Sequence, residues 1–366
     1  MSCDYIALAN QGVQGLSAYQ AGKPIEELQR ELGLEHIVKL ASNENPLGPS
    51  AKVLAAIGKA AADIVRYPDS NGFELKAALA DRLAVASQQI TLGNGSNDVL
   101  DLIARAYLEP GKSAVFSQHA FVVYPLAVKA CGARAIVTKA KDWGHDLNAM
   151  VDAIADDTRV VFIANPNNPT GTLLSEAAIV DFLDKVPTNV IVVLDEAYFE
   201  YTNSADDGTD GIALLKYYPN LVVTRTFSKA YGLAALRVGY AVASAEITDV
   251  LNRVRAPFNV NSLALAAATA VLADSDYLER GRQVNREGMQ QLTSGVKALG
   301  LRFIPSAGNF LAVEFKTDTG KLYQDLLKQG VIVRPVGVYE MPNHLRVSIG
   351  LQQENAAFLS ALEKVL

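Results

Sequence analysis

One lysine stands where an apolar stretch gives way to a glycine-containing turn, in the segment LVVTRTFSKAYGLAALRVGY at residues 221–240. The lysine is Lys229, and its neighbours in the sequence include Thr226, Ser228 and Arg237. Hydroxyl and guanidinium donors of this kind can bind a phosphate beside an amine that has to react as a nucleophile. Without these neighbours, a lysine after a strand would be an ordinary surface residue. With them, the segment is the first candidate for a reactive site.

A second candidate lies in ITLGNGSNDVLDLIARAYL, where Ser96 and Asn97 follow two glycines and open an amphipathic helical pattern. A polar turn at the start of a helix presents free backbone N–H groups and the positive end of the helix dipole, which together suit a phosphate. Alone, the pattern could equally be a cap that only stabilises the helix. Beside Lys229 and Arg237, it is expected to form the other side of a phosphate site.

Charged side chains inside apolar segments are further candidates. Asp195 ends the strand-like run VIVVLD, and α/β proteins place ligand sites at the carboxyl ends of such strands. An acid that caps the next turn is the alternative for Asp195. Arg334 and Arg346 each lie within an apolar segment and are expected to face a polar cavity or an acidic partner. Structural salt bridges are the alternative for both arginines.

The composition bounds the class of protein. The chain has 366 residues, 50% of them hydrophobic and 20% charged, and a net charge of −6. This balance is typical of an enzyme that binds neither nucleic acid nor an anionic membrane surface. Two cysteines, no basic amino-terminal leader and no apolar run of roughly 20 residues predict a cytoplasmic protein without a membrane span. Four scattered histidines give no metal-binding or serine-triad pattern.

The order of the predicted elements indicates an α/β fold with two domains. Strands and helices alternate over residues 48–256, which predicts a large domain with a doubly wound, mostly parallel sheet. Residues 257–366 predict a smaller α+β domain, with longer helices over residues 262–299 and then strands in FIPSAGNFLAVEF, GVIVRPV and HLRVSIG. Residues 1–47 read as an arm that contributes to the small domain and to the site.

The motif S-K-A-Y-G-L-A-x-L-R-V-G-Y resembles the lysine motif of fold-type I pyridoxal-phosphate (PLP) aminotransferases, and within them that of the histidinol-phosphate aminotransferases. The likeness extends over nearly the whole chain. It implies that Lys229 is catalytic and binds PLP covalently, and that Arg237 binds the cofactor phosphate with Ser96, Asn97, Thr226 and Ser228. Ala235 stands where the family more often has glycine, a change of one methyl group.

The resemblance also implies contacts to the cofactor ring. Asn168, in ANPNNPTG, would bind the ring oxygen together with Tyr198, and Asp195 would keep the pyridine nitrogen protonated. Phe121 corresponds to the aromatic residue that stacks on the ring, although composition alone favours a core position for it. Tyr67, in the segment RYPDSNG, would reach the phosphate of a partner chain, so the resemblance implies a homodimer.

For the substrate, the resemblance implies Tyr19, Asn43, Arg334 and Arg346 as binding residues. The implied reaction converts histidinol-phosphate and 2-oxoglutarate into imidazole-acetol phosphate and glutamate, in histidine biosynthesis. Its ligands would be a small amino donor and a 2-oxo acid, and no metal is expected. An aromatic amino acid aminotransferase and a threonine-phosphate decarboxylase are the alternatives. A PLP-fold transcription regulator is disfavoured because no basic helix-turn-helix segment precedes Ser50.

Overall fold

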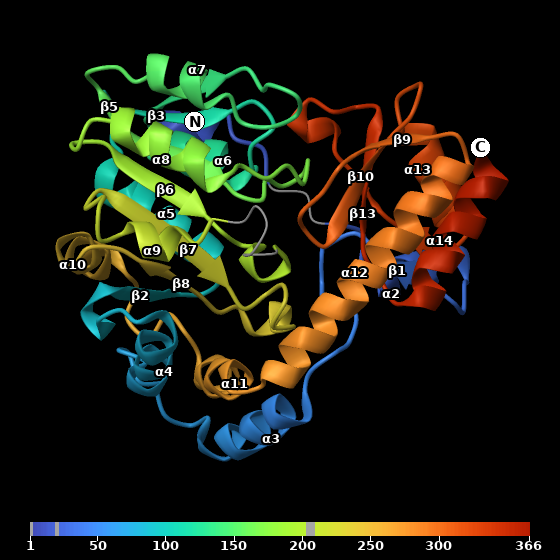
Figure 1. The fold of residues 1–366 in the computed structure, drawn as a ribbon, viewed down its shortest axis with the longest axis horizontal. Coiled ribbons are helices and arrows are strands. Elements are labelled where there is room, and N and C mark those ends of the chain that lie inside the picture. Colours follow the sequence, from blue (N-terminus) through green and yellow to red (C-terminus); the bar gives the residue numbers. More distant parts are fainter. Residues whose placement is uncertain (1–2, 19–21, 203–208) are drawn as a thin grey trace.

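A computed structural model describes residues 3–18, 22–202 and 209–366, and it has two main sheets, each flanked by helices (Figure 1). The large sheet has seven strands. Strand β8 pairs antiparallel with both of its neighbours, and all pairs that do not involve β8 are parallel. In spatial order the strands are β2 (Ile90–Gly93), β8 (Gly239–Val242), β7 (Leu221–Thr226), β6 (Ile191–Asp195), β5 (Thr158–Ala164), β3 (Ser113–Ser117) and β4 (Arg134–Thr138).

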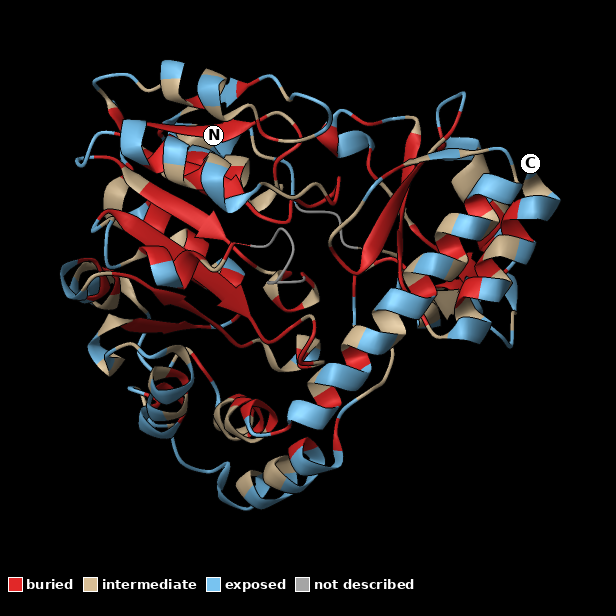
Figure 2. Ribbon diagram, in the orientation of Figure 1, coloured by how far each residue is buried: buried red, intermediate tan, exposed pale blue. Residues whose placement is uncertain are grey.

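Helices cover both faces of the large sheet, since alternate residues of one strand pack into two separate cores. On β5, Val160 and Phe162 join the core that α5, α6 and α10 close, whereas Val161 and Ile163 join the core that α7, α8 and α11 close. The strands are accordingly buried along most of their length, except the edge strand β4, where Arg134 and Val137 are exposed (Figure 2). The helices of this region are α1 (Gln11–Gln14), α3 (Ala51–Ala60), α4 (Phe73–Leu83), α5 (Ser96–Tyr107), α6 (Val123–Ala130), α7 (Leu147–Asp152), α8 (Glu176–Lys185), α9 (Gly211–Leu214), α10 (Ala245–Val254) and α11 (Ser262–Leu272).

The second sheet is antiparallel and has the order β12-β13-β10-β9. Its helices pack on one face only, so that its other face is turned toward the large domain (Figure 1). A separate parallel pair joins β1 of the amino-terminal region to β11. The elements are α2 (Ile25–Leu32), β1 (Val38–Lys39), α12 (Ser275–Ala298), β9 (Arg302–Ile304), β10 (Phe310–Glu314), α13 (Gly320–Lys328), β11 (Val331–Ile332), β12 (Arg334–Pro335), β13 (His344–Ser348) and α14 (Gln352–Val365).

Two of the predicted strands are divided in the structure. Residues 303–315 form β9 and β10, because the segment PSAGN between them contains proline and glycine and turns the chain back on itself. Residues 330–336 form β11 and β12, which belong to different sheets. The predicted domain boundaries stay predictions. Helix α11 begins after residue 256 but packs on α3 and α4, and the long helix α12 then runs to the small domain.

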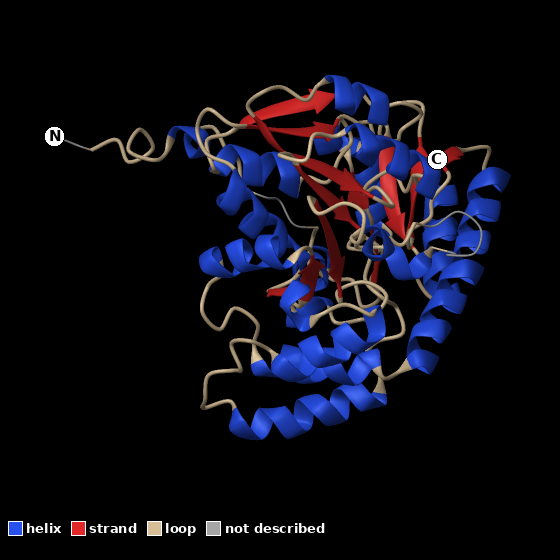
Figure 3. Cartoon of the chain, turned by 60° about the vertical axis from the view of Figure 1, so that its left-hand side comes forward, coloured by secondary structure: helices blue, strands red, loops and turns tan. Residues whose placement is uncertain are grey.

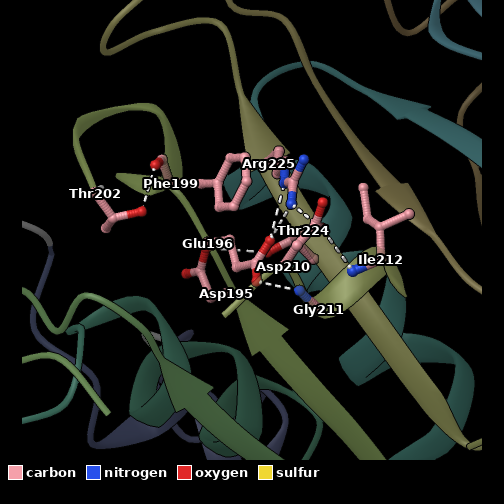
Figure 4. A network of polar contacts seen from close by, with 9 residues as sticks. All are labelled: Asp195, Glu196, Phe199, Thr202, Asp210, Gly211, Ile212, Thr224 and Arg225. Carbon is pink, nitrogen blue, oxygen red and sulfur yellow. Dashed lines mark hydrogen bonds and ion pairs between the residues drawn. The ribbon is translucent and has the colours of Figure 1, made fainter. Parts of the chain in front are cut away.

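A buried ion pair fixes the ends of β6 and β7 behind the site (Figure 4). Arg225 donates to Oε2 of Glu196 from both Nε and Nη2, at 2.9 and 2.6 Å, and Nη2 also donates to Asp210 at 2.7 Å. Oε1 of Glu196 accepts the backbone N–H of Gly211 at 2.8 Å. Because the carboxylate of Glu196 and the guanidinium of Arg225 are paired and hydrogen-bonded, both charges can be buried at the ends of these strands.

Candidate active site

One cavity of about 200 Å³ lies between the two domains, at the carboxyl ends of β5, β6 and β7. It is bounded by the first turn of α5 on one side and by β12 and β13 on the other. Most of the site residues predicted from the sequence line this cavity: Asn43, Ser96, Asn97, Phe121, Asn168, Asp195, Tyr198, Thr226, Ser228, Lys229, Arg237, Arg334 and Arg346.

Two predicted residues are not among them. Tyr19 lies outside the described residues. Tyr67 lies in the loop before α4, with 82% of its surface exposed, and stacks on Phe258 with the ring centroids 4.6 Å apart. Tyr67 therefore takes no part in the cavity of its own chain.

Lys229 follows β7 and extends into the centre of the cavity. Its Nζ donates to the carbonyl oxygen of Ser42 at 2.9 Å, and the amine lies 5.8 Å from the ring centroid of Tyr198. Burial lowers the pKa of Lys229 to about 7, and the nearby cations Arg346 and Arg237 act in the same direction. Near neutral pH the amine is therefore neutral in a large part of the molecules, which is the form that can attack a carbonyl or accept a proton.

The donors expected to bind a phosphate gather at the start of α5. Arg237 donates from Nη1 to Oγ of Ser228 and to the carbonyl of Ala234, both at 3.0 Å. Two glycines make the approach possible. A Cβ on Gly95 would lie 2.3 Å from Nη2 of Arg237, and a Cβ on Gly239 would lie 2.4 Å from the backbone nitrogen of Ser96. The result is a narrow cradle of N–H groups and one guanidinium.

Next to Ser228, the hydroxyl of Thr226 has a structural partner. Its Oγ1 accepts the backbone N–H of Ser228 at 3.1 Å, which fixes the turn between β7 and Lys229. Asn97, in the first turn of α5, is exposed but also lines the cavity. The cradle therefore combines a rigid turn from one strand with the amino end of one helix.

Asp195 is a buried carboxylate at the end of β6. Tyr124 donates its hydroxyl to Oδ2 at 2.8 Å, and Thr224 donates to Oδ1 at 3.0 Å. Burial raises the pKa of Asp195, whereas the hydrogen bonds from Tyr124 and Thr224 oppose that change. Among the described residues Asp195 has no ion-pair partner, so its buried carboxylate suits a cationic group of a ligand. Sequence reasoning missed Tyr124, since a tyrosine within an apolar helical pattern resembles any core residue.

A chain of polar side chains connects Tyr198 of the large domain to Ser348 of the small domain. Asn43 donates from Nδ2 to the hydroxyl of Tyr198 at 2.9 Å, and Ser348 donates to Oδ1 of Asn43 at the same distance. Burial raises the pKa of Tyr198 to about 12, so that the phenol stays protonated and can donate to a ligand oxygen. Asn43 has a φ of 54°, a left-handed conformation that asparagine tolerates better than most residues.

The two predicted arginines lie opposite each other on β12 and β13. Arg346 donates from Nη1 to Oδ1 of Asn168 and from Nη2 to the carbonyl of Ala41 at 2.7 Å. Only 6% of Arg346 is exposed, and its buried Nε has no hydrogen-bond partner among the described residues. Since Arg334 lines the same cavity, this wall offers guanidinium donors to an anionic ligand.

Phe121 and Tyr339 close the remaining sides of the cavity. The ring of Phe121 meets Tyr124 edge to face, with the centroids 5.9 Å apart, so its position is fixed by the core beneath it. Tyr339 comes from the small domain, in the short helical turn Gly337–Tyr339, and is buried. Tyr339 and Ser42 were missed from the sequence, because neither lies in a motif. Groups of three or more metal-binding side chains do not occur within residues 3–18, 22–202 and 209–366.

Comparison with known proteins agrees with this geometry. Residues 35–362 match the model of the aminotransferase class I and II family. Histidinol-phosphate aminotransferase 2 of Pseudomonas fluorescens is 61% identical, over 100% of this chain and 99% of the relative, and its Pseudomonas aeruginosa counterpart is 62% identical over 99% of each. The crystal structure of histidinol-phosphate aminotransferase from Sinorhizobium meliloti in complex with pyridoxal-5'-phosphate is 30% identical, has a TM-score of 0.89, and is matched over 97% of this chain and 96% of that chain.

The chain belongs to the aminotransferase class I and II family. Within that family, its full-length relatives at 61% and 62% identity carry the name histidinol-phosphate aminotransferase. The resemblance inferred from the lysine motif is therefore confirmed, and the predicted α/β fold is confirmed with it. Across the described part of the chain, no helix is both long enough and apolar enough to cross a membrane.

The role of the cradle in phosphate binding can be tested by substituting two glycines, one inside the cradle and one outside it. Gly95→Ala should weaken PLP binding at least tenfold, because the new methyl group would displace the Arg237 guanidinium. Gly111→Ala is the control, since Gly111 has nearly the same φ, +87° against +88°, but no atom lies within 4 Å of the place that its methyl group would take. Both variants should lose about 1–3 kcal/mol of folding stability, because a positive φ strains a residue that carries a side chain. Titration of the cofactor-free proteins with PLP measures the two affinities. Equal affinities would contradict the assignment of the cradle to the cofactor phosphate.

Proposed function

We propose that this protein is a PLP-dependent aminotransferase that moves the amino group of histidinol-phosphate to 2-oxoglutarate, and that it does so in histidine biosynthesis. The observation that carries the proposal is the position of Lys229. Its amine has a pKa of about 7 and lies between a cradle of phosphate donors and a wall with two arginines. The names and high identity of the full-length relatives support the choice of substrate.

The residues of the cavity fit the cofactor PLP end to end. Arg237, the first turn of α5 and the hydroxyl of Ser228 would hold its phosphate, and Asp195 would pair with its pyridine nitrogen. Asn168 and Tyr198 would bind its ring oxygen, and Phe121 would lie against its ring. When bound, PLP supplies an electron-withdrawing ring that stabilises negative charge on the substrate carbon.

Lys229 has two tasks in this scheme. Its neutral Nζ would hold the cofactor covalently. Once the amino substrate is bound in its place, the neutral Nζ would accept a proton from the substrate carbon and, as the ammonium, would be the donor that returns this proton to the bound cofactor. Both tasks need a neutral amine near pH 7, which burial and the cations Arg346 and Arg237 favour. The carbonyl of Ser42 orients the amine in the meantime.

Arg346 and Arg334 would bind the anionic ends of both substrates. Histidinol-phosphate carries a phosphate and glutamate carries a carboxylate, and a guanidinium can bind either with paired hydrogen bonds. The two substrates must occupy the same cavity in turn, so one arginine wall can serve both. Both arginines line the cavity. Asn43 is proposed to line the same pocket, with its amide held by Tyr198 and Ser348.

The direct test is an assay of the purified protein with histidinol-phosphate and 2-oxoglutarate, in which glutamate is measured. Wild-type protein should form glutamate, whereas Lys229→Ala should bind PLP without turnover, because the phosphate cradle does not depend on the amine. Phenylalanine and threonine phosphate are the comparison substrates. Faster reaction with phenylalanine, or release of carbon dioxide from threonine phosphate, would replace the proposal with an aromatic aminotransferase or a decarboxylase.

The arginine wall generates a second prediction. Arg346→Lys keeps the charge but loses the planar fork, and it should cost about 1.5–3 kcal/mol in kcat/KM in each half-reaction, the value of a hydrogen bond to a charged group. Single-turnover absorbance changes of the bound cofactor measure the two halves separately. A variant that is slowed with glutamate but unaffected with histidinol-phosphate would show that the two anions do not share Arg346.

We also propose that the active unit is a homodimer in the cytoplasm. Tyr67 and Phe258 form an exposed aromatic pair outside their own cavity, with 82% and 42% of their surfaces exposed. The amino-terminal segment extends away from the body of the molecule and exposes Tyr5, Ile6 and Leu8 (Figure 3). Exposed apolar groups of this size favour burial against a second copy, where Tyr67 could complete the partner's phosphate site.

Mixed dimers test this assembly. Consider a heterodimer of one Tyr67→Phe chain and one Lys229→Ala chain. If Tyr67 of each chain serves the site of its partner, both substitutions fall in one site and the other site is intact. Such a heterodimer should keep about half of the wild-type activity, as expected for one of two equivalent sites. Tyr67→Phe homodimers should bind PLP more weakly. A fully active monomer, established by sedimentation under assay conditions, would exclude the exchange of Tyr67.

A further inference from the structure

The face of β13 that looks toward the large domain carries a row of three side chains. His344, Arg346 and Ser348 alternate with Leu345 and Val347, which enter the core beneath the helices of the small domain. The outward row therefore lies along the interface between the two domains. Each member of the row contacts a different part of the cavity wall or of the large domain.

Two of these contacts belong to the active site itself. Ser348 binds Asn43, which in turn binds Tyr198, and Arg346 binds Asn168. If Arg346 binds the substrate anion, its hydrogen bond to Asn168 is exposed to competition whenever a ligand enters. A contact that involves no ligand-binding group can hold β13 in place when a ligand competes for Arg346.

His344 supplies a contact of that kind. Its imidazole meets the indole of Trp143 edge to face, with the centroids 4.8 Å apart, and on the large domain Trp143 also packs on His119 at 5.3 Å. Only 3% of His344 is exposed, and neither ring nitrogen has a hydrogen-bond partner among the described residues. Burial lowers the pKa of His344, so the ring stays neutral at physiological pH and serves as an aromatic surface.

His119 connects this stack to the cavity on both sides. Its Nδ1–H donates to the backbone carbonyl of Tyr339 at 2.7 Å, so it binds the small-domain turn that places Tyr339 in the cavity. The carbonyl oxygen of His119 accepts a hydrogen bond from Nδ2 of Asn167 at 3.0 Å, beside Asn168. In the sequence, Phe121 lies two residues after His119. One histidine thus fixes groups on the cofactor side and on the substrate side.

The backbone at Trp143 is unusual for so large a residue. Asp142 and Trp143 have φ values of 49° and 66° and form a two-residue hairpin turn closed by reciprocal backbone hydrogen bonds between Lys141 and Gly144. Such turns favour asparagine and glycine, because both central residues need a positive φ. Strained conformations of this kind persist where the surrounding packing over-determines them, and they cluster at functional sites.

We propose that the stack of His119, Trp143 and His344, which we term the interdomain clamp, positions Arg346 and Tyr339 for substrate binding. The aromatic contacts of Trp143 and His344 involve no residue assigned to the cofactor, so substitutions at these two positions act on the substrate side of the pocket. The inference rests on the proposed function only in that the cavity binds an amino substrate. Trp143 and His344 are positioning residues, since they act through Arg346 and Tyr339.

The test separates KM from kcat. Trp143→Ala should raise KM for glutamate at least tenfold and change kcat less than threefold, with PLP occupancy unchanged, because only the seating of the small domain is lost. Trp143→Phe restores an aromatic surface and should return KM to within threefold of wild type. His344→Phe should keep KM near the wild-type value, whereas His344→Ala should resemble Trp143→Ala. His36→Ala changes an exposed histidine outside the clamp and is the matched control.

Glutamate is the chosen probe because its half-reaction does not depend on the identity of the second substrate. A failure of the histidinol-phosphate proposal would leave this test intact. The sequence contains one tryptophan, so tryptophan fluorescence, excited where tyrosine does not absorb, reports on Trp143 alone. Trp143 emission in wild-type protein should change as glutamate binds and the small domain settles, and this change should be lost in His344→Ala. Unchanged KM in Trp143→Ala, or no rescue by Trp143→Phe, would overturn the proposal.

Discussion

The neutral amine of Lys229 is the constraint on which the rest of the site depends. An ammonium group in this cavity would be desolvated and would face two cations, Arg346 and Arg237, so both effects favour the neutral form. One of these cations comes from the small domain and the other from the large domain. The chemistry of a single side chain is therefore controlled by the way in which the two domains pack.

The large sheet supplies the positions that this arrangement requires. Parallel strands bring their carboxyl ends to one edge, and here Asp195 and Lys229 lie at or just beyond the ends of adjacent strands, β6 and β7. A carboxylate at such an edge is costly to bury, and the structure offsets that cost with hydrogen bonds from Tyr124 and Thr224. Behind them, the paired charges of Glu196 and Arg225 hold the same two strand ends together.

The small domain contributes Arg346 of β13, Arg334 of β12 and Tyr339 of a short helical turn to the cavity. Alternation along β13 sends apolar residues into the helices and polar residues toward the cavity, so that one strand both anchors the domain and lines the pocket. Because β13 does both, substrate binding depends on the position of the small domain. A change in the seating of β13 would move Arg346, which belongs to the wall proposed to bind the substrate anion.

The sequence by itself determined the α/β fold, the family and most of the cavity residues, because these are written in local patterns: apolar strands, a helix start after glycines, and a lysine eight residues before an arginine. Only the tertiary structure decided which remote side chains complete the site. Tyr124 beneath Asp195, Ser42 against Lys229, and the clamp around Trp143 join residues far apart in the chain. These contacts depend on how the sheets and domains pack together, so a local pattern in the sequence does not predict them.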